Sequence, residues 1–316
     1  TKGSHYDAIS VMAPTLTVAE QFYSSNGVPI SEDKGDFWSK NYPNRYEFTI
    51  IPDEGNNKHY LKIGEETAYL HLNREPRFYA NLSFDRGTWY GYGYASDEPK
   101  DLAFYKFRAK EVSGRITSED YSYTGYLNKK VCSYKTSVTD NGLSTERYAF
   151  PIIRLADLYL MYAEALNNIS EGTHYQVASW DGSQTYDIFR DKEQMRRGVK
   201  PVRMRAGVPD YSDEVYENPK KFFEKIVHER QIEFFAETQR YYDLRRWKIV
   251  EEHEGEQIYG CNTLMNEEYK DMFYLPVRVA ELQTSFSRKQ YFWPISFDEL
   301  KRNNNLSQAP GWQNYD

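Results

Sequence analysis

Long apolar runs are missing from this sequence, which has 316 residues and a mean hydropathy of −0.82. A helix that crosses a bilayer needs about 20 consecutive, mainly apolar residues, and no segment approaches that length. We therefore expect no membrane-spanning helix. The chain begins Thr1-Lys2-Gly3, without a signal peptide or a cysteine that could carry a lipid. Taken alone, that start would suit a cytoplasmic protein.

Cysteine is nearly absent, because the chain has only Cys132 and Cys261, far apart in the sequence. Neither belongs to a Cys-x-x-Cys pair or to a Cys/His cluster with the spacing of a zinc site. One disulfide in an exported protein and two free, buried thiols are both consistent with this pair. No metal site is predicted.

A surplus of basic residues is also missing. Lys and Arg number 40 against 47 Asp and Glu, which gives a net charge of −7 and a pI near 5.6. Nucleic acids are held mainly through contacts of Lys and Arg with phosphate. Since an acidic chain does not provide that attraction, nucleic acid is excluded as the expected partner.

The common motifs of catalysis and cofactor binding are missing as well. None of the six histidines belongs to a His-Glu-x-x-His motif, and there is no Gly-x-Ser-x-Gly element or phosphate-binding loop. The stretch from Gly91 to Tyr94 lacks the third glycine of a nucleotide fingerprint, and its tyrosines would obstruct a phosphate-cradling turn. We therefore predict no catalytic residues and no cofactor.

Tyrosine is the residue in excess. The chain has 29, more than it has Leu, which is ordinarily among the commonest residues. Tyr and Trp combine a flat apolar ring with a polar group, which suits a surface that must be both wet and adhesive. A sugar ring matches such a surface because it has an apolar C–H face and a rim of hydroxyls. Most of the individual tyrosines are nevertheless expected in the core or in half-buried loops.

Residues 1–150 are predicted to be loop-rich with short strands, because Gly, Pro, Asn and Asp interrupt them repeatedly. A short helix is expected over residues 15–23, with Thr15 as its N-cap. The alternation over residues 78–84 predicts one strand. Residues 151–316 are predicted to be helical, and the two parts are expected to form one compact unit.

The clearest helix is predicted over residues 151–169. Its apolar residues lie on several sides, which is typical of a helix buried between neighbours. A loop is predicted from Asn167 to Thr185. The charged segment 187–206 is predicted to be helical in parts, with Gly198 and Pro201 as interruptions.

Gly207 is expected to end that charged segment as a helix C-cap. Pro219 is expected to open the longest helix, which runs to about Lys248. The strong helices at 151–169 and 219–248 resemble an antiparallel pair of the tetratricopeptide type, although no second full repeat is found.

Glu229, Glu233 and Glu237 recur at steps of four on this long helix and therefore share one face. Carboxylates grouped in this way bind a metal or serve a glycosidase in other proteins. The alternative is that they pair with arginines of the same and adjacent helices, since buried charges are retained only when paired. Charge-patterned helices usually carry such networks, so we favour ion pairing.

The most distinctive loop spans residues 89–94, where two glycines separate the aromatic residues. Glycine permits backbone angles that let neighbouring rings point outward, and exposed aromatic patches usually mark binding surfaces. A twisted edge strand packed beneath another loop would explain the pattern equally well. The predicted ligand-binding residues of this loop are Trp89, Tyr90, Tyr92 and Tyr94.

Trp38 and Trp180 are further candidates for ligand binding. Trp38 is expected in a loop that follows Asp36. Trp180, next to Asp181, lies in the long predicted loop between helices, and long loops in compact domains are often functional.

Three signatures occur in order in the second half of the chain. They are RLADLYLMYAEALN at Arg154–Asn167, HERQIEFFAETQRYYDLRRW at His228–Trp247, and YFWPI at Tyr291–Ile295 followed by NNNLSQAPGW at Asn303–Trp312. Matching stretches at residues 14–30, 75–79 and 124–130 extend the likeness over most of the chain. Together they resemble the SusD/RagB family of outer-membrane nutrient-binding lipoproteins from Bacteroidetes-type bacteria.

The resemblance implies a mainly α-helical, SusD-like fold, with tetratricopeptide-type helix pairs and a loop-rich part that contains short strands. SusD-like proteins are usually much longer, so the match implies the C-terminal portion of such a protein. Its lipid anchor and first helical repeats would have been trimmed or would lie on another chain. The resemblance also places the acidic helix, Trp247, Trp293 and Trp312 in the structural framework.

The resemblance further implies a binding protein rather than an enzyme. Family members capture a nutrient at the cell surface, with an oligosaccharide as the expected ligand, and act as a lid over a SusC-like TonB-dependent transporter. Their ligand-binding aromatic residues come from variable loops, and membrane association would occur only through a lipid anchor that this chain lacks. Some relatives handle peptides. A glycoside hydrolase using a carboxylate pair and a helical-repeat adaptor without a small ligand stay open as alternatives.

Overall fold

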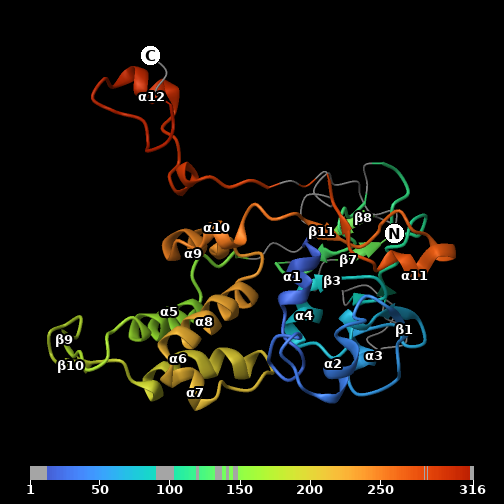
Figure 1. Ribbon diagram of the computed structural model, residues 1–316, viewed down its shortest axis with the longest axis horizontal. Coiled ribbons are helices and arrows are strands. Elements are labelled where there is room, and N and C mark those ends of the chain that lie inside the picture. The colour runs from blue at the N-terminus through green and yellow to red at the C-terminus, as the bar shows by residue number, and fades with distance from the viewer. Residues whose placement is uncertain are drawn as a thin grey trace.

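The computed structural model is mainly α-helical, and the strands among its described residues pair into two-stranded sheets (Figure 1). It describes residues 13–89, 103–118, 121–131, 137–139, 142–144, 149–280, 282 and 284–313. The predicted fold class is confirmed. Within the described residues, no helix combines the length and the apolar character that crossing a membrane requires.

The loop-rich first part contains short helices and antiparallel strand pairs. Thr15 caps the first helix as predicted, since its Oγ1 accepts a hydrogen bond from the backbone N–H of Val18 at 3.2 Å. The strands pair as β1–β2, β3–β6, β4–β5 and β7–β8. The elements are α1 (Leu16–Gln21), α2 (Asp36–Asn41), β1 (Phe48–Ile50), α3 (Asn57–Tyr60), β2 (Glu66–Ala68), η1 (Tyr69–His71), α4 (Pro76–Asn81), β3 (Leu82–Ser83), β4 (Thr88–Trp89), β5 (Ala103–Phe104), β6 (Leu127–Asn128), β7 (Ser137–Thr139) and β8 (Gly142–Ser144).

The strand predicted over residues 78–84 is wrong, because most of that segment belongs to helix α4. Pro76 occupies the first turn of α4, where proline is favoured. Phe78 and Tyr79 are both buried although they are adjacent. Burial of consecutive side chains removes the in-and-out alternation that a half-exposed strand needs.

The second part is built from longer helices and one β-hairpin. The loop predicted between Asn167 and Thr185 contains strand β9, which pairs with β10, so that prediction is also wrong. The elements are α5 (Leu155–Asn167), β9 (Tyr175–Ala178), β10 (Thr185–Ile188), α6 (Lys192–Arg205), α7 (Asp213–Glu217), α8 (Pro219–Glu233), α9 (Gln239–Trp247), α10 (Val250–His253), β11 (Tyr259–Gly260), η3 (Glu267–Tyr269), α11 (Lys270–Phe273), β12 (Val277–Arg278), η4 (Arg288–Tyr291) and α12 (Phe297–Arg302).

Helix α6 runs without interruption through Gly198 and Pro201, contrary to the prediction. Its apolar side chains belong to the same core as those of α5. A Cβ atom at Gly198 would lie 2.5 Å from the carbonyl oxygen of Tyr159, so this glycine permits the close approach of the two helices. Gly207 follows the helix with a left-handed φ of 78°, as its predicted role requires.

The helix predicted from Pro219 to about Lys248 is two helices, α8 and α9, separated by residues 234–238. Ala236 and Thr238 in this connection have left-handed φ values of 58° and 66°. Such backbone angles cannot continue a right-handed helix. The periodicity of the sequence runs across the break, so the prediction missed it.

Two apolar clusters hold most of the buried hydrophobic residues that the structure describes. The first lies in the loop-rich part but also receives Ile232, Phe273 and Tyr274 from the second part. The second lies among α5, α6, α7 and α8. Cys261 in the first cluster is a free, buried thiol, whereas Cys132 lies outside the described residues. The division of the chain at residue 150 stays a prediction, and the first cluster draws residues from both sides of it.

The C-terminal segment leaves the body of the molecule after β12 and ends beyond α12, as the red trace in Figure 1 shows. Trp312 is partly buried, and its indole N–H donates to the carbonyl of Lys289 at 3.0 Å. The side chain of Trp293 is 74% exposed and has the ring of Tyr241 at a centroid distance of 6.0 Å. The expectation of a packed framework residue is therefore wrong for Trp293.

Candidate functional site

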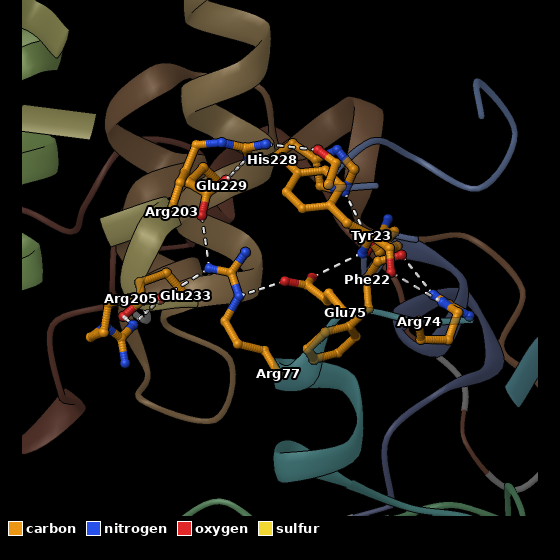
Figure 2. A network of polar contacts seen from close by, with 12 residues as sticks. Phe22, Tyr23, Arg74, Glu75, Arg77, Arg203, Arg205, His228, Glu229 and Glu233 are labelled. Carbon is orange, nitrogen blue, oxygen red and sulfur yellow. Dashed lines mark hydrogen bonds and ion pairs between the residues drawn. The ribbon is translucent and has the colours of Figure 1, made fainter. Parts of the chain in front are cut away.

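Glu229 of α8 lies at the centre of a buried charge network that joins α6 and α8 to α4 (Figure 2). Its carboxylate accepts hydrogen bonds from Arg77 at 2.7 Å and from Arg203 at 2.6 Å. Burial raises the pKa of Glu229, but the two guanidinium groups outweigh burial and bring it to about 2. The carboxylate is therefore ionised and fully engaged at neutral pH.

Glu233 and Glu237, which together with Glu229 we call the acidic ladder, are paired as well. Glu233 accepts from Arg154 at 2.6 Å and from Arg205 at 2.5 Å. Glu237 accepts from Arg154 at 2.7 Å and also pairs with Lys130. The predicted pairing of Glu229, Glu233 and Glu237 with cationic side chains is confirmed.

This pairing decides what the ladder can do chemically. A glycosidase acid needs a carboxyl group that is protonated near neutral pH, and the pKa of Glu229 is shifted in the opposite direction. Within the described residues, no group of three or more His, Cys, Asp and Glu side chains could hold a metal ion. The ladder therefore holds the fold together and offers no free acid or metal ligand.

The same network continues into the loop-rich part of the chain. Arg77 donates to Glu75 at 2.7 Å, and Glu75 accepts the backbone N–H of Tyr23 at 2.9 Å. Arg74 donates to the backbone carbonyls of Ala19 and Phe22, each at 2.6 Å. In Figure 2 these residues form a continuous path from α8 to the chain after α1. Arginines that satisfy main-chain oxygens in this way fix loop positions.

Trp38 was predicted to bind ligand, and the structure places it in the core instead. Its side chain is only 1% exposed, and its indole N–H donates to the carbonyl of Asn73 at 3.2 Å. The ring of Phe37 packs edge-on against it. A ring covered in this way presents no face to a sugar, so the prediction is wrong for Trp38. A short helix, α2, replaces the loop expected there.

Trp89 is partly exposed in strand β4, where its ring meets that of Tyr105 edge-on at 6.0 Å. The other predicted residues of this loop, Tyr90, Tyr92 and Tyr94, lie outside the described residues. The aromatic site over residues 89–94 therefore stays a prediction.

Trp180 is 98% exposed, the highest value among the predicted residues that the structure describes. It lies in the turn that joins β9 to β10, a hairpin that projects from the end of the helical part in Figure 1. The backbone N–H of Ser179 donates to the carbonyl of Gln184 at 2.8 Å and closes the turn. Gly182 supplies a left-handed φ of 70°.

Asp181 organises the turn beside Trp180. Its Oδ1 accepts hydrogen bonds from the hydroxyl of Ser179 at 2.6 Å and from the N–H and hydroxyl of Ser183 at 3.0 and 2.8 Å. These hydrogen bonds lower the pKa of Asp181 to about 2. A charged carboxylate and two hydroxyls are therefore held next to a freely exposed indole ring.

The hairpin behind this turn carries further exposed aromatic residues. In its register Tyr175 faces Ile188 and Val177 faces Tyr186. Opposed residues point to the same side of a sheet, so these side chains share one face, and Tyr175, Val177 and Tyr186 are exposed on it. On the other face, Gln176 donates to Asp187 at 2.7 Å.

Tyr175 and Tyr186 were missed by the sequence reasoning. The signal that could have found them is the alternation on both sides of the Asp181-Gly182 turn, which is typical of a β-hairpin. Trp180 with these two tyrosines forms the aromatic hairpin, which is the candidate site. An exposed indole beside fixed hydroxyls and a carboxylate can stack on a sugar face and orient its hydroxyls.

Buried arginine–carboxylate pairs hold the helical scaffold together, and a hairpin with exposed aromatic side chains projects from it. The chain belongs to the SusD family, whose family model matches residues 2–312. It is similar to SusD-like protein P2 of Formosa agariphila, with 26% identity over 248 residues that cover 71% of this chain and 41% of that protein.

Solved structures show the same fold. The protein BT4246, in its selenomethionine form, superposes with a TM-score of 0.72 at 25% identity, covering 95% of this chain and 46% of that one. A SusD-like carbohydrate-binding protein of Bacteroides fragilis, BF0978, superposes with a TM-score of 0.55 at 21% identity, covering 93% and 48%. The chain thus spans less than half the length of these relatives.

Proposed function

We propose that this chain binds a nutrient glycan at the cell surface and passes it to a SusC-like TonB-dependent transporter in the outer membrane. The observation that carries the proposal is the aromatic hairpin, with Trp180 98% exposed at its tip. The hairpin carries three exposed aromatic side chains, Tyr175, Trp180 and Tyr186, and exposed apolar side chains that cluster usually mark binding surfaces.

The family supports the chemical class of the ligand. One relative with the same fold is described as a carbohydrate-binding protein. The hairpin has the matching parts, because Trp180 offers a flat apolar face and Asp181, Ser179 and Ser183 offer hydrogen-bonding groups beside it. A neutral oligosaccharide can use both, stacking its C–H face on the indole and bonding its hydroxyls to the rim.

The pairing of Glu229, Glu233 and Glu237 supports delivery of the ligand rather than its hydrolysis. The ladder carboxylates are occupied by arginine and lysine, so none of them is poised as a glycosidase acid. A protein that hands its ligand to a transporter needs release, and moderate affinity follows from a small stacking surface. Attachment to the outer membrane would use a lipid anchor, as the family implies.

The test is glycan binding by Trp180→Ala. A glycan array on the full gene product identifies a ligand, and calorimetry then compares the variants. We expect Trp180→Ala to lose about 2 kcal/mol of binding free energy, roughly 30-fold in Kd, as aromatic hot spots do. The melting temperature should not change, since the ring is almost fully exposed.

Trp293→Ala is the matched control, because Trp293 is also an exposed tryptophan but lies outside the hairpin. It should bind the glycan like the unaltered protein. Equal loss in both variants, or full binding by Trp180→Ala, would remove the hairpin as the site and leave the predicted loop at residues 89–94. Selective binding of peptides instead of glycans would show that the ligand is a peptide.

A further inference from the structure

The three aromatic side chains of the aromatic hairpin lie at different levels along it. Tyr175 faces Ile188 and Tyr186 faces Val177, so the two tyrosines lie on the same face and two residues apart along the strands. Because a strand rises about 3.4 Å per residue, their levels differ by about 7 Å. Trp180 lies in the turn beyond the ends of the strands, roughly 14 Å from the level of Tyr175 on the same scale. The rings therefore form a row that runs from the base of the hairpin to its tip.

This row is open to solvent, on a hairpin that projects from the helical part (Figure 1). Tyr175, Val177 and Tyr186 are exposed on one face, so the surface between the two tyrosines is apolar as well. The ring of Trp180 is almost fully exposed, and a ligand on this face can therefore reach it. The opposite face is polar and carries the hydrogen bond that Gln176 donates. One face of the hairpin thus offers an apolar strip with an aromatic ring at each end.

The length of the row limits which ligands can use all of it. One sugar ring stacks on one aromatic side chain, and it is too small to reach across the roughly 14 Å from Tyr175 to Trp180. A single sugar or a disaccharide therefore contacts only part of the row. A linear chain of three or more units can lie along the strip and stack on every ring. Each further ring that is covered removes apolar surface from water and adds to the binding free energy.

We propose that the aromatic hairpin selects linear oligosaccharides of at least three sugar units, which lie along it from Tyr175 past Tyr186 to Trp180. Trp180 holds any chain that reaches the tip. Tyr175 and Tyr186 determine the specificity for length, because a short chain seated on Trp180 does not extend to them. The inference rests on the proposed function, since it takes the hairpin as the glycan-binding site, and it adds the size and shape of the ligand.

The test is a calorimetric titration of the full gene product with linear fragments of two to six sugar units, prepared from the polysaccharide that the glycan array identifies. We expect the Kd to fall about tenfold between the shortest and the longest fragment, the scale of one aromatic contact in an interface. The Kd should level off once the chain covers the row, because further units find no ring to stack on.

Tyr175→Ala should raise the Kd of the six-unit fragment about tenfold and leave that of the two-unit fragment unchanged. Tyr175→Phe keeps the ring and should bind both fragments like the unaltered protein. Tyr186→Ala is the second variant, in case Tyr175→Ala does not fold, and it too should weaken the longer fragment more. Tyr269→Ala, at an exposed tyrosine of η3 outside the hairpin, is the control and should change neither Kd.

Two sets of results separate this inference from the proposed function. Equal Kd values for all lengths, or an equal change for both fragments in Tyr175→Ala, would overturn the selection for length. The proposed function would then stand as long as Trp180→Ala still weakens glycan binding. If no glycan binds, or if Trp180→Ala binds fully, the proposed site fails and the inference fails with it.

Discussion

At the scale of single residues, buried arginines hold the carboxylates of the interior in place. Arg77 and Arg203 make Glu229 a permanent anion in the interior, and Arg230 does the same work between Asp157 and Asp243 at 3.0 and 2.7 Å. Each guanidinium bonds two carboxylates or backbone oxygens at once through a rigid, planar set of N–H donors, which lysine does not have. The buried charges therefore position helices, and removing one of them leaves its partners charged, buried and unpaired.

The pKa of Glu229 leads to a pH prediction. Because it is depressed from its ordinary value of 4.5 to about 2, its stabilising contribution is present above pH 4.5 and is lost as the pH falls towards 2. The contribution is about 3 kcal/mol. Chemical denaturation of the unaltered protein and of Glu229→Gln over this pH range should show a steeper loss of stability in the unaltered protein.

Glu299→Gln is the control for that experiment. Glu299 is an exposed residue of α12 that pairs with the exposed side chain of Arg302, so its replacement should leave the pH dependence unchanged. At pH 7 the Glu229→Gln protein should already be less stable, because Arg77 and Arg203 lose their shared anion. Parallel pH profiles for the unaltered protein and Glu229→Gln would contradict the assignment.

At the scale of elements, close contact between helices matters more than local propensity. Helix α6 contains both a glycine and a proline and still runs from Lys192 to Arg205. Its contact with α5 explains the glycine, since a methyl group at Gly198 would lie 2.9 Å from the Cβ atom of Ala163. The break between α8 and α9 has the same kind of cause, because it turns Phe234 into the core and Glu237 towards Arg154.

Gly198→Ala tests the contact between α5 and α6. By propensity alone this change should stabilise a helix by about 1 kcal/mol. The clash with Tyr159 and Ala163 should instead destabilise the protein by about 1–3 kcal/mol, the usual cost of overpacking. Thermal and urea denaturation measure the sign directly. Lys200→Ala, on the exposed side of the same helix, should be neutral or slightly stabilising, and a stabilised Gly198→Ala would show that the helices are farther apart.

At the scale of the whole molecule, the acidic charge and the aromatic hairpin constrain the ligand. A net charge of −7 does not attract anionic glycans, and stacking on Trp180 requires no charge. We therefore expect binding of the cognate glycan to change little between low and high salt, because screening acts on charged partners. Calorimetry at several salt concentrations checks this expectation. A steep loss of affinity with salt would point to a charged ligand.

We also expect the protein not to hydrolyse the glycan that it binds. Incubation of the purified protein with its ligand should release no product, since the clustered glutamates are held by cations. Reproducible hydrolysis that disappears after a single Asp or Glu substitution would restore the hydrolase alternative.

Some of the site could be predicted and some could not. Trp180 is exposed where a candidate was expected, but Trp38, chosen on similar grounds, is a core residue. Both are tryptophans in polar surroundings of the sequence. What separates them is whether a distant segment covers the ring, and for Trp38 that cover includes the carbonyl of Asn73. Contacts between residues so far apart in the chain leave no signal in the local sequence.

The sequence by itself determined the family, the Thr15 cap, the glycine after α6 and the pairing of the acidic ladder, because each depends on neighbouring residues or on charges that cannot be buried alone. Only the tertiary structure decided where helices stop and which aromatic rings reach solvent. The turn between α8 and α9 and the burial of Trp38 both require partners far along the chain. Their energies come from packing and charge pairing across the fold, which no local pattern encodes.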